Sequence, residues 1–178
     1  MKLLKNIEFG NPFLRKKAKK VSLKFLKTVQ GKNLIENMIF TMRKNNGVGL
    51  AAPQIGKSWQ LVVMEIRSTP TRPNQKPYGP IIVANPKIIN YSKKIVDGWE
   101  GCTSIKGIFA RVPRSKSVTV EYYNEKGKKI IKNSTDFLAR IFQHEIDHLN
   151  GIGFMDRVVD NRTFITASEF KKIIAKRK

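Results

Sequence analysis

The two histidines of the chain, His144 and His148, lie four residues apart in the stretch QHEIDHLNG at residues 143–151. A step of four residues turns an α-helix by only about 40° past a full circle, so both imidazoles project from the same side, one turn apart. Two imidazoles in this arrangement can bind one metal ion, and Glu145 beside them can reach a metal-bound water. The stretch therefore predicts a metal site rather than two unrelated structural histidines.

A hydrolytic metal site usually takes three protein ligands and keeps one position for water, so the histidines need a partner. Glu169 lies downstream of His148, where many metalloproteases carry their third ligand, but it stands among lysines and apolar residues of the terminal segment. Cys102, in the stretch DGWEGCTS, is the other candidate. A lone cysteine is usually a small core residue, but this one falls in an expected glycine-containing polar turn, where a thiolate can face a metal. Spacing alone leaves both candidates open.

A third stretch, GVGLAAPQIG at residues 47–56, combines the closely spaced Gly47 and Gly49 with the amide side chain of Gln54. Gly47 and Gly49 permit a positive φ or a close backbone approach. Gln54 is the polar side chain of an otherwise apolar run. It can serve either as a buried amide bonded to backbone or as an N–H donor to a developing oxyanion.

Taken together and in this order, GVGLAAPQIG, EGCTS and QHEIDH resemble the three motifs of peptide deformylases. The resemblance extends to RVPRSKSVTVEYYNEKGK between the second and third motifs, and to the methionine-containing helix expected before the first. It covers nearly all of the chain up to about residue 157. Three motifs in matching order and spacing are far more specific than any one of them.

The resemblance implies a metallohydrolase that removes the formyl group from N-formylmethionine at the start of new polypeptides. It implies one divalent metal ion per chain, Fe²⁺ in the native protein, with Zn²⁺, Ni²⁺ or Co²⁺ able to substitute. The implied metal ligands are Cys102, His144 and His148. The implied catalytic groups are Glu145 as general acid and base, and Gln54 with the backbone N–H of Thr103 as the oxyanion hole. A thiolate with two imidazoles suits iron or zinc better than magnesium or calcium.

The substrate implied by the resemblance is an extended N-formylmethionyl peptide that pairs like an added strand with the segments around Val48 and Gly101. The methionine side chain would enter a pocket formed partly by the catalytic helix. The implied substrate-binding residues are Val48, Gly49, Gly101, Phe137 and Ile141, beside His144 and Glu145.

Three residues depart from the usual pattern of the family. Thr103 replaces the leucine of the Glu-Gly-Cys-Leu-Ser motif, which keeps the backbone donor but loses an apolar wall. Lys106 stands where proline is common, and Arg140 replaces an apolar residue on the catalytic helix near the methionine pocket. These departures predict altered substrate preference or rate and leave the reaction class unchanged.

The elements that must position these residues follow from periodicity and turn residues. Apolar residues at helical spacing predict a helix over 33–47, ended by Gly47. The stretch TDFLARIFQHEIDHLNG at 135–151 predicts a second one that Ser134, Thr135 or Asp136 caps and Gly151 ends. Residues 59–66 and 81–89 read as extended, with Pro86 at an edge or a break, and 67–80 as a surface loop. Residues 117–132 alternate as a hairpin around NEKG.

This element order favours an α+β fold with mostly antiparallel sheets packed around a central metal-binding helix. We expect a single catalytic domain over residues 1–178, with a basic C-terminal helix at about 166–178. The start of the chain lacks an apolar signal and no run is long enough to span a membrane, so we expect a cytoplasmic, bacterial-type protein. The single cysteine, which excludes an internal disulfide, fits a reducing compartment.

The 35 Lys and Arg residues against 13 Asp and Glu residues give a net charge of +22. Such a charge attracts polyanions, and some deformylases resembling this chain dock on the ribosome through a basic C-terminal helix. We therefore consider a ribosome surface as a partner, without sequence-specific nucleic acid or a membrane; a general bias towards lysine explains the charge equally well.

Two alternative functions remain at this stage. One is a zinc endopeptidase of the His-Glu-x-x-His type with Glu169 as its third ligand. The other is a non-catalytic RNA-binding or ribosome-binding protein with a structural metal, although the chain offers no fourth His or Cys for a closed site.

Overall fold

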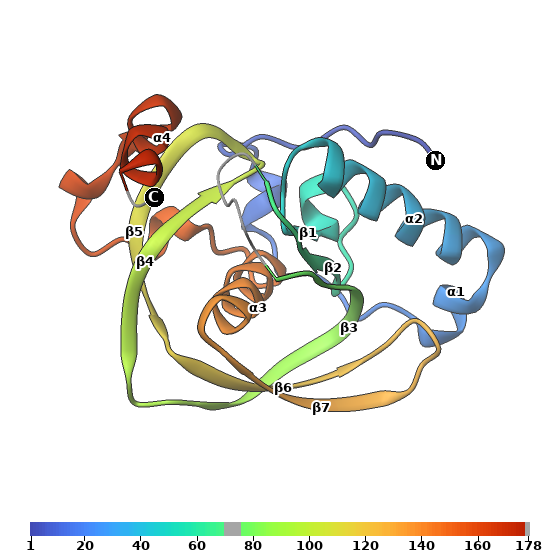
Figure 1. Ribbon diagram of the computed structural model, residues 1–178. Coiled ribbons are helices and arrows are strands. Elements are labelled where there is room, and N and C mark those ends of the chain that lie inside the picture. Colours follow the sequence, from blue (N-terminus) through green and yellow to red (C-terminus); the bar gives the residue numbers. More distant parts are fainter. Residues whose placement is uncertain (70–75, 177–178) are drawn as a thin grey trace.

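A computed structural model describes residues 1–69 and 76–176 of the chain. Helix α3 (Asp136–Leu149) runs through the middle of the molecule, between a larger and a smaller β-sheet (Figure 1). Each pair of neighbouring strands in the two sheets is antiparallel. The predicted α+β class, with antiparallel sheets around a central helix, is confirmed.

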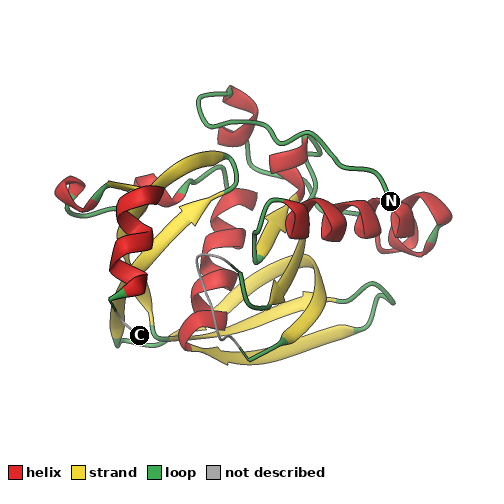
Figure 2. Ribbon diagram, turned by 45° about the horizontal axis from the view of Figure 1, so that its top comes forward, coloured by secondary structure: helices red, strands yellow, loops and turns green. Residues whose placement is uncertain are grey.

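The larger sheet has the strand order β1-β2-β3-β6-β7 and the smaller one the order β4-β5-β8. The strands are β1 Gly49–Ala51, β2 Leu61–Ile66, β3 Tyr78–Tyr91, β4 Ile95–Cys102, β5 Ile105–Ser115, β6 Ser117–Tyr123, β7 Lys129–Thr135 and β8 Ile165–Thr166. The remaining helices are α1 Leu23–Lys27, α2 Val29–Lys44 and α4 Ala167–Ala175, with short 3-10 turns η1 Pro12–Arg15, η2 Ala52–Ile55, η3 Phe154–Arg157 and η4 Asn161–Thr163. Figure 2 shows α1 and α2 on one side of α3 and α4 on the other.

Helix α3 is buried around almost its whole circumference, and every residue from Ile141 to Leu149 is buried. It begins after Thr135, as predicted, but neither Thr135 nor its neighbours supply a capping side chain. The hydroxyl of Ser134 is buried and has no hydrogen-bond partner within residues 1–69 and 76–176. The expected side-chain cap is therefore wrong. Ser134 and Thr135, which precede the helix, are the last residues of β7, and their conformation follows the sheet.

The C-terminal end of α3 is fixed by its glycine, as predicted. Gly151 has a φ of +76°, which a side chain would strain, and its N–H donates to the carbonyl of His148 at 3.2 Å. The N–H of Ile152 reaches back to the carbonyl of Asp147 at 3.0 Å. These two bonds form a Schellman motif, so the backbone around His148 is held from both sides.

The hairpin β4–β5 is a feature that the sequence did not predict. Cys102 was expected in a polar turn, but it is the last residue of β4, and the turn begins at Thr103. Glycine, aspartate and proline are depleted in strands, and this hairpin contains Gly98, Gly101 and Pro113, which hid its strand character. Cys102 is therefore presented by a strand end, a more rigid support than a loop.

The other expected elements differ mainly at their ends. Helix α2 begins four residues before the predicted start at residue 33, because Thr28 accepts a capping hydrogen bond from the N–H of Gly31. The strand at 59–66 and the hairpin around NEKG are confirmed. Residues 70–75 of the predicted loop at 67–80 lie outside the described residues, and Tyr78–Pro80 already belong to β3.

Pro86 lies inside the long strand β3, at the break that its missing N–H requires. The register between β3 and β6 shifts between Ala84 and Lys87, and pairing with β2 ends at Ala84. Pro86 therefore disrupts no ladder on the β2 side. In the described part of the chain no helix is long and apolar enough to cross a membrane.

Candidate metal centre

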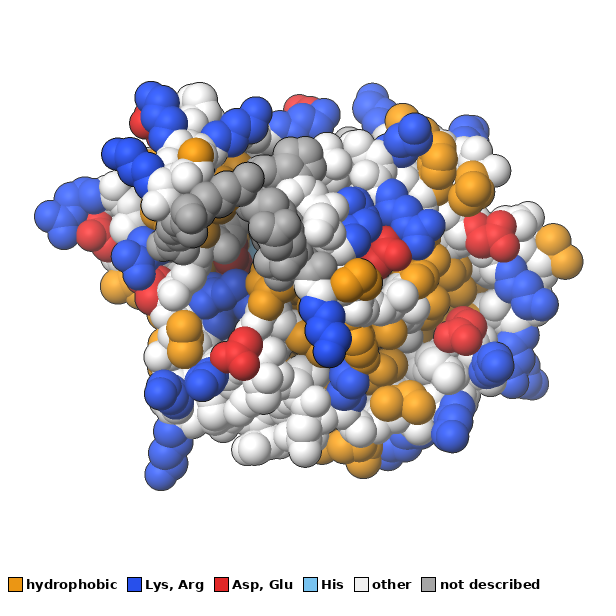
Figure 3. Space-filling model, in the orientation of Figure 1, with side chains coloured by type: hydrophobic (Ala, Val, Ile, Leu, Met, Phe, Trp, Pro, Cys, Tyr) orange, Lys and Arg blue, Asp and Glu red, His pale blue; other side chains and the backbone are white. Residues whose placement is uncertain are grey.

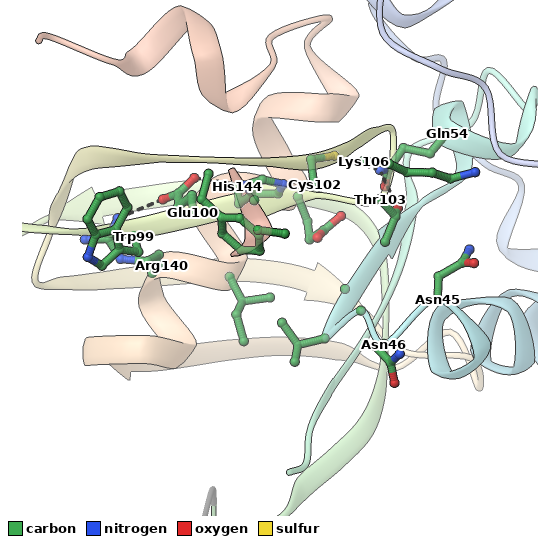
Figure 4. A pocket seen from close by; sticks show the side chains of 18 of the residues that line it. Asn45, Asn46, Gln54, Trp99, Glu100, Cys102, Thr103, Lys106, Arg140 and His144 are labelled. Carbon is green, nitrogen blue, oxygen red and sulfur yellow. Dashed lines mark hydrogen bonds and ion pairs between the residues drawn. The ribbon is translucent and has the colours of Figure 1, made fainter. Parts of the chain in front are cut away.

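The side chains of His144 and His148, which the sequence predicts as metal ligands, converge with Cys102 at the interface between α3 and β4. One ligand atom from each of Cys102, His144 and His148 lies within 4.8 Å of the other two. The Cys102 Sγ is 3.2 Å from the His148 Nε2, and Figure 4 shows Cys102 and His144 facing each other across the site. One thiolate and two imidazoles from two elements, with no fourth ligand in the group that the described residues form, match the ligand set of a catalytic iron or zinc site.

The electrostatic surroundings suit a bound cation. Burial raises the pKa of Cys102, but the charges and hydrogen bonds of His148 and His144 outweigh it and hold the pKa well below its ordinary value. Burial lowers the pKa of His144, but hydrogen bonds with Cys102 and Glu100 outweigh it and raise the pKa to about 10. The lowered pKa of Cys102 reflects the positive charge of the two histidines, whereas the raised pKa of His144 reflects the negative charge of the thiolate and of Glu100. The negative charges that favour the protonated ring lie where the ligand atoms meet. A divalent cation is stabilised by the same negative charges.

Glu100, two residues before Cys102 on β4, orients the first histidine. Its Oε2 lies 2.8 Å from the Nδ1 of His144, which leaves the Nε2 of that ring directed at the centre. Burial raises the pKa of Glu100, but its bonds with His144 and Arg114 lower the pKa well below its usual range, so the carboxylate is ionised. A carboxylate behind a ligating imidazole fixes its tautomer and raises its basicity.

Arg114 of β5 connects this carboxylate back to the helix. Its Nε and Nη2 each donate to an oxygen of Glu100 at 3.0 Å, and its Nη1 pairs with Asp147 between the two histidines. Arg157 binds Asp147 from the other side. The sequence analysis missed all four residues. For Glu100 and Asp147, the proximity of an acidic residue to each ligand motif was the available signal, whereas Arg114 and Arg157 carry no local signal.

Glu145 occupies the position expected of a proton-transferring group. Its Oε2 is buried without a hydrogen-bond partner among the described residues. Burial raises the pKa of Glu145, against the lowering effect of the two histidine charges. A Cβ on Gly49 would lie 2.2 Å from its Oε1, so glycine at that position makes room for the carboxylate. An orphaned buried oxygen beside three ligand atoms fits a site built for a metal, its water and a substrate.

Gln54 lies in η2, directly after the edge strand β1, and its amide orientation is fixed. The Oε1 accepts from the N–H of Ala51 at 2.8 Å, so the Nε2 must face the centre. That nitrogen donates to the Cys102 Sγ at 3.3 Å and to the hydroxyls of Thr103 and Ser104 at 3.3 and 3.2 Å. The backbone bond considered from the sequence is therefore present, and it leaves the amide N–H facing the centre; the role as a donor to an oxyanion stays a prediction.

Of these groups, Gln54, Glu100, Cys102, His144 and Glu145 line a cavity of about 260 Å³. Of the residues expected to bind substrate, Val48, Gly49, Gly101, Phe137 and Ile141 all line it. Trp99, Phe109 and Ala167 also line it and were not expected from the sequence.

Two of the residues that depart from the family pattern take different positions at this cavity. The exposed Lys106 lies at its wall and pairs with Glu8 across 3.7 Å. Arg140 also lines the cavity, but its guanidinium is directed at the backbone of β4 and β5 (Figure 4).

Glu169, the alternative third ligand, is not part of the centre. It lies on α4 with its side chain 54% exposed and pairs with Lys172 at 2.7 Å. It does not belong to the ligand group that the described residues form. The endopeptidase alternative based on this residue is therefore wrong.

Comparison with known proteins gives one consistent result. The family model described as polypeptide deformylase matches residues 4–164. The chain is 44% identical over 174 residues to Peptide deformylase 2 of Nostoc sp., covering 98% of this chain and 96% of that one.

Solved structures agree with the sequence relatives. A class I type b peptide deformylase from Acinetobacter baumannii, crystallised with Met-Ala-Ser, is similar with a TM-score of 0.85 and 34% identity, over 88% of this chain and 99% of that one. Peptide deformylase from Thermotoga maritima is similar with a TM-score of 0.80 and 39% identity, over 90% of this chain and 100% of that one.

The ligand set predicts that Cys102→Ala abolishes binding of a divalent metal, because two imidazoles alone remain. Glu169→Ala is the matched control and should retain full metal content. Metal analysis after dialysis of both variants checks this. Loss of metal from Glu169→Ala together with retention by Cys102→Ala would contradict the assignment.

Proposed function

The chain belongs to the polypeptide deformylase family, and we propose that its centre hydrolyses the formyl group of N-formylmethionyl nascent polypeptides through Cys102, His144, His148 and Glu145. The observation that carries this proposal is the convergence of three ligand atoms beside the orphaned carboxylate oxygen of Glu145, next to a cavity that Cys102, His144 and Glu145 line. A deformylation assay on formyl-Met peptides, with protein purified anaerobically and its metal content measured, tests it directly.

Cys102, His144 and His148 would hold one divalent ion, Fe²⁺ in the native protein, with Zn²⁺, Ni²⁺ or Co²⁺ as substitutes. When bound, such an ion supplies a Lewis acid that polarises the formyl carbonyl and lowers the pKa of water from about 15.7 towards 7. The lowered pKa of Cys102 supports this, because the thiolate is the ligand form of the side chain.

Glu145 accepts the proton of the attacking water and delivers it to the leaving amine. Its free Oε2 supplies an acceptor position that no protein donor occupies among the described residues. The burial that raises its pKa brings the carboxyl closer to the working pH, where a group can both take and return a proton.

The Nε2 of Gln54 and the backbone N–H of Thr103 serve as donors to the oxyanion that forms on the formyl carbon. The bond from Ala51 to Gln54 supports this role, because it fixes the amide before substrate arrives. Donors held in place need no reorganisation as the charge develops.

The peptide backbone of the substrate pairs as an added strand between β1 and β4. Both strands lie at the edge of their sheets, so each has an unpaired backbone side, and Gly49 and Gly101 on them line the cavity. The methionine side chain occupies the apolar part of the cavity beside Val48, Phe137 and Ile141.

The partner that we propose is ribosomal RNA in the cytoplasm, and this protein would contact it through the basic helix α4. Lys171, Lys172 and Lys176 are exposed there, while Arg177 and Lys178 lie outside the described residues. Figure 3 shows Lys and Arg side chains spread widely over one face of the molecule, with few acidic ones. Docking would raise the local concentration of nascent chains without a new contact in the cavity.

Glu145→Gln is predicted to keep its metal and lose turnover, because the amide cannot accept the water proton. Proton transfer of this kind contributes about 10²–10⁴-fold, so kcat should fall by about that factor. Glu36→Gln on the exposed face of α2 is the control. Steady-state kinetics on a formyl-Met peptide decide it, and an unchanged kcat for Glu145→Gln would remove the proposed role.

Thr103→Val is predicted to raise kcat. The Thr103 hydroxyl accepts from the Nε2 of Gln54 at 3.3 Å and from Asn6 at 2.9 Å, and so competes for an oxyanion donor. A neutral hydrogen bond contributes about 0.5–1.5 kcal/mol net, which corresponds to about a 2- to 10-fold gain. Thr103→Ser keeps the hydroxyl and should leave kcat unchanged. A lower kcat in the valine variant alone would show that the hydroxyl assists the reaction.

Replacing Lys171, Lys172 and Lys176 by glutamine is predicted to weaken ribosome binding and to leave free-peptide deformylation unchanged. Substitution is preferable to deletion, because Phe170 of the same helix stacks on Phe109 of the cavity wall. The matched control replaces Lys87, Lys126 and Lys128, all exposed elsewhere. Phosphate contacts make log affinity fall with log salt at about 0.7–0.9 per contact, so titrations at several salt concentrations are informative. Equal ribosome affinity of the two triple variants would exclude the helix as a specific dock.

A further inference from the structure

We propose that Arg140 is a positioning residue of the metal centre. It joins α3 to the β4–β5 hairpin and so keeps His144 and Cys102 at a fixed distance from each other. The inference rests on the proposed metal site. It assigns Arg140 a role other than the change in methionine selectivity that its place near the cavity suggested from the sequence.

The Arg140 guanidinium bonds to both strands of the hairpin. Its Nη1 donates to the carbonyl of Val112 on β5 at 2.7 Å and to the Oε1 of Glu100 on β4 at 2.8 Å. Its Nη2 donates to the carbonyl of Val96 at 2.6 Å. The side chain is only 12% exposed. Because Arg140 precedes His144 by one helical turn, these bonds attach the strands to the same face of α3 that carries the ligand.

Glu100 is the point at which this attachment reaches the ligands. Its Oε1 accepts from Arg114 at 3.0 Å and from Arg140 at 2.8 Å, and its Oε2 accepts from Arg114 at 3.0 Å and from His144 at 2.8 Å. A carboxylate offers about four lone-pair positions, and here each has a donor. Its plane is therefore fixed, and with it the ring of His144. Without Arg140, the Oε1 of Glu100 would keep one of its two described donors, Arg114 of β5.

Gly98 makes room for this arrangement. A Cβ at position 98 would lie 2.9 Å from the Arg140 Nη2 and 3.0 Å from its Cζ. The far end of a long side chain can usually move aside, but this one is bound to four backbone or carboxylate acceptors, one of them the carbonyl of Gly98 at 3.4 Å. Gly98→Ala is thus a second way to displace the guanidinium, and it leaves every charge unchanged.

The same contacts argue against a role in selecting the substrate side chain. Both terminal nitrogens of Arg140 already donate to protein acceptors, and its charge is compensated by Glu100 at 2.8 Å. The charge of a guanidinium held in this way is used inside the protein.

The test measures the affinity of the purified full-length protein for Zn²⁺ and Co²⁺ by competition with a chelator. Partners behind a metal ligand typically contribute about 10- to 100-fold in metal affinity, so Arg140→Met should lose about that factor and Gly98→Ala a smaller one. Arg140→Lys, which keeps the charge but offers a single ammonium, should recover part of the loss.

Arg111→Met is the matched control, because Arg111 also cross-links β5 to β4, through Asp97 at 2.8 Å, but is 49% exposed. Among the described residues, its side chain forms its ion pair with Asp97 and not with Glu100 or α3. Its metal affinity should equal that of the wild type. Equal affinity in Arg140→Met and the wild type, or equal losses in Arg140→Met and Arg111→Met, would overturn the proposal.

Two further measurements separate positioning from general stability and from selectivity. Thermal unfolding of the metal-free variants shows whether Arg140→Met affects only the fold; a lowered midpoint with unchanged metal affinity contradicts the proposal. In metal-saturated protein, the ratio of kcat/KM for formyl-Met and formyl-Leu peptides should stay at its wild-type value, and a changed ratio with unchanged metal affinity would restore the selectivity role. Failure of the wild type itself to bind metal would instead overturn the proposed centre as a whole.

Discussion

Three ligand atoms from two separate elements can meet only if α3 and β4 keep a fixed separation, and the buried carboxylate of Glu100 provides that constraint. It lies on β4, holds His144 of α3 at 2.8 Å, and is itself bound by Arg114 of β5. The larger sheet cannot provide the same connection, because among the strands of the described residues β4 pairs with β5 alone. The position of Cys102 at the end of β4 therefore depends on polar contacts across the helix, since hydrophobic packing alone is less directional.

Burying this network has a free-energy cost that good geometry must offset. Removing an ion from water costs several kcal/mol, and breaking a buried pair by removing one partner is typically destabilising by about 3–5 kcal/mol. Here the buried carboxylates of Glu100 and Asp147 face the guanidinium groups of Arg114, Arg140 and Arg157, so no acid of the network lacks a basic partner. A satisfied polar network of this kind restricts the interior to one arrangement, which a site requiring fixed ligand distances needs.

Local signals in the sequence predicted the catalytic helix and its paired histidines, because helical spacing is set by neighbours along the chain. They did not decide between Cys102 and Glu169, since that choice depends on which segment folds next to α3. The hairpin that carries Cys102 was missed because its glycines and proline obscure strand propensity. Arg114 was missed for a different reason: its partners Glu100 and Asp147 lie 14 and 33 residues away, beyond any local pattern.

Gly49 and Gly101, which line the cavity, leave room along the path proposed for the substrate. A Cβ at Gly49 would collide with the carboxylate of Glu145, and one at Gly101 would come within 2.6 Å of the ring of Phe109. Each lies on an edge strand, β1 and β4, and exposed edges generally invite unwanted pairing between chains. Here β1 has only three residues and both edges border the cavity. The unpaired backbone groups of these two edges thus lie where the proposed peptide substrate would pair with them. The absence of side chains at Gly49 and Gly101 would let that peptide approach Glu145 and Cys102.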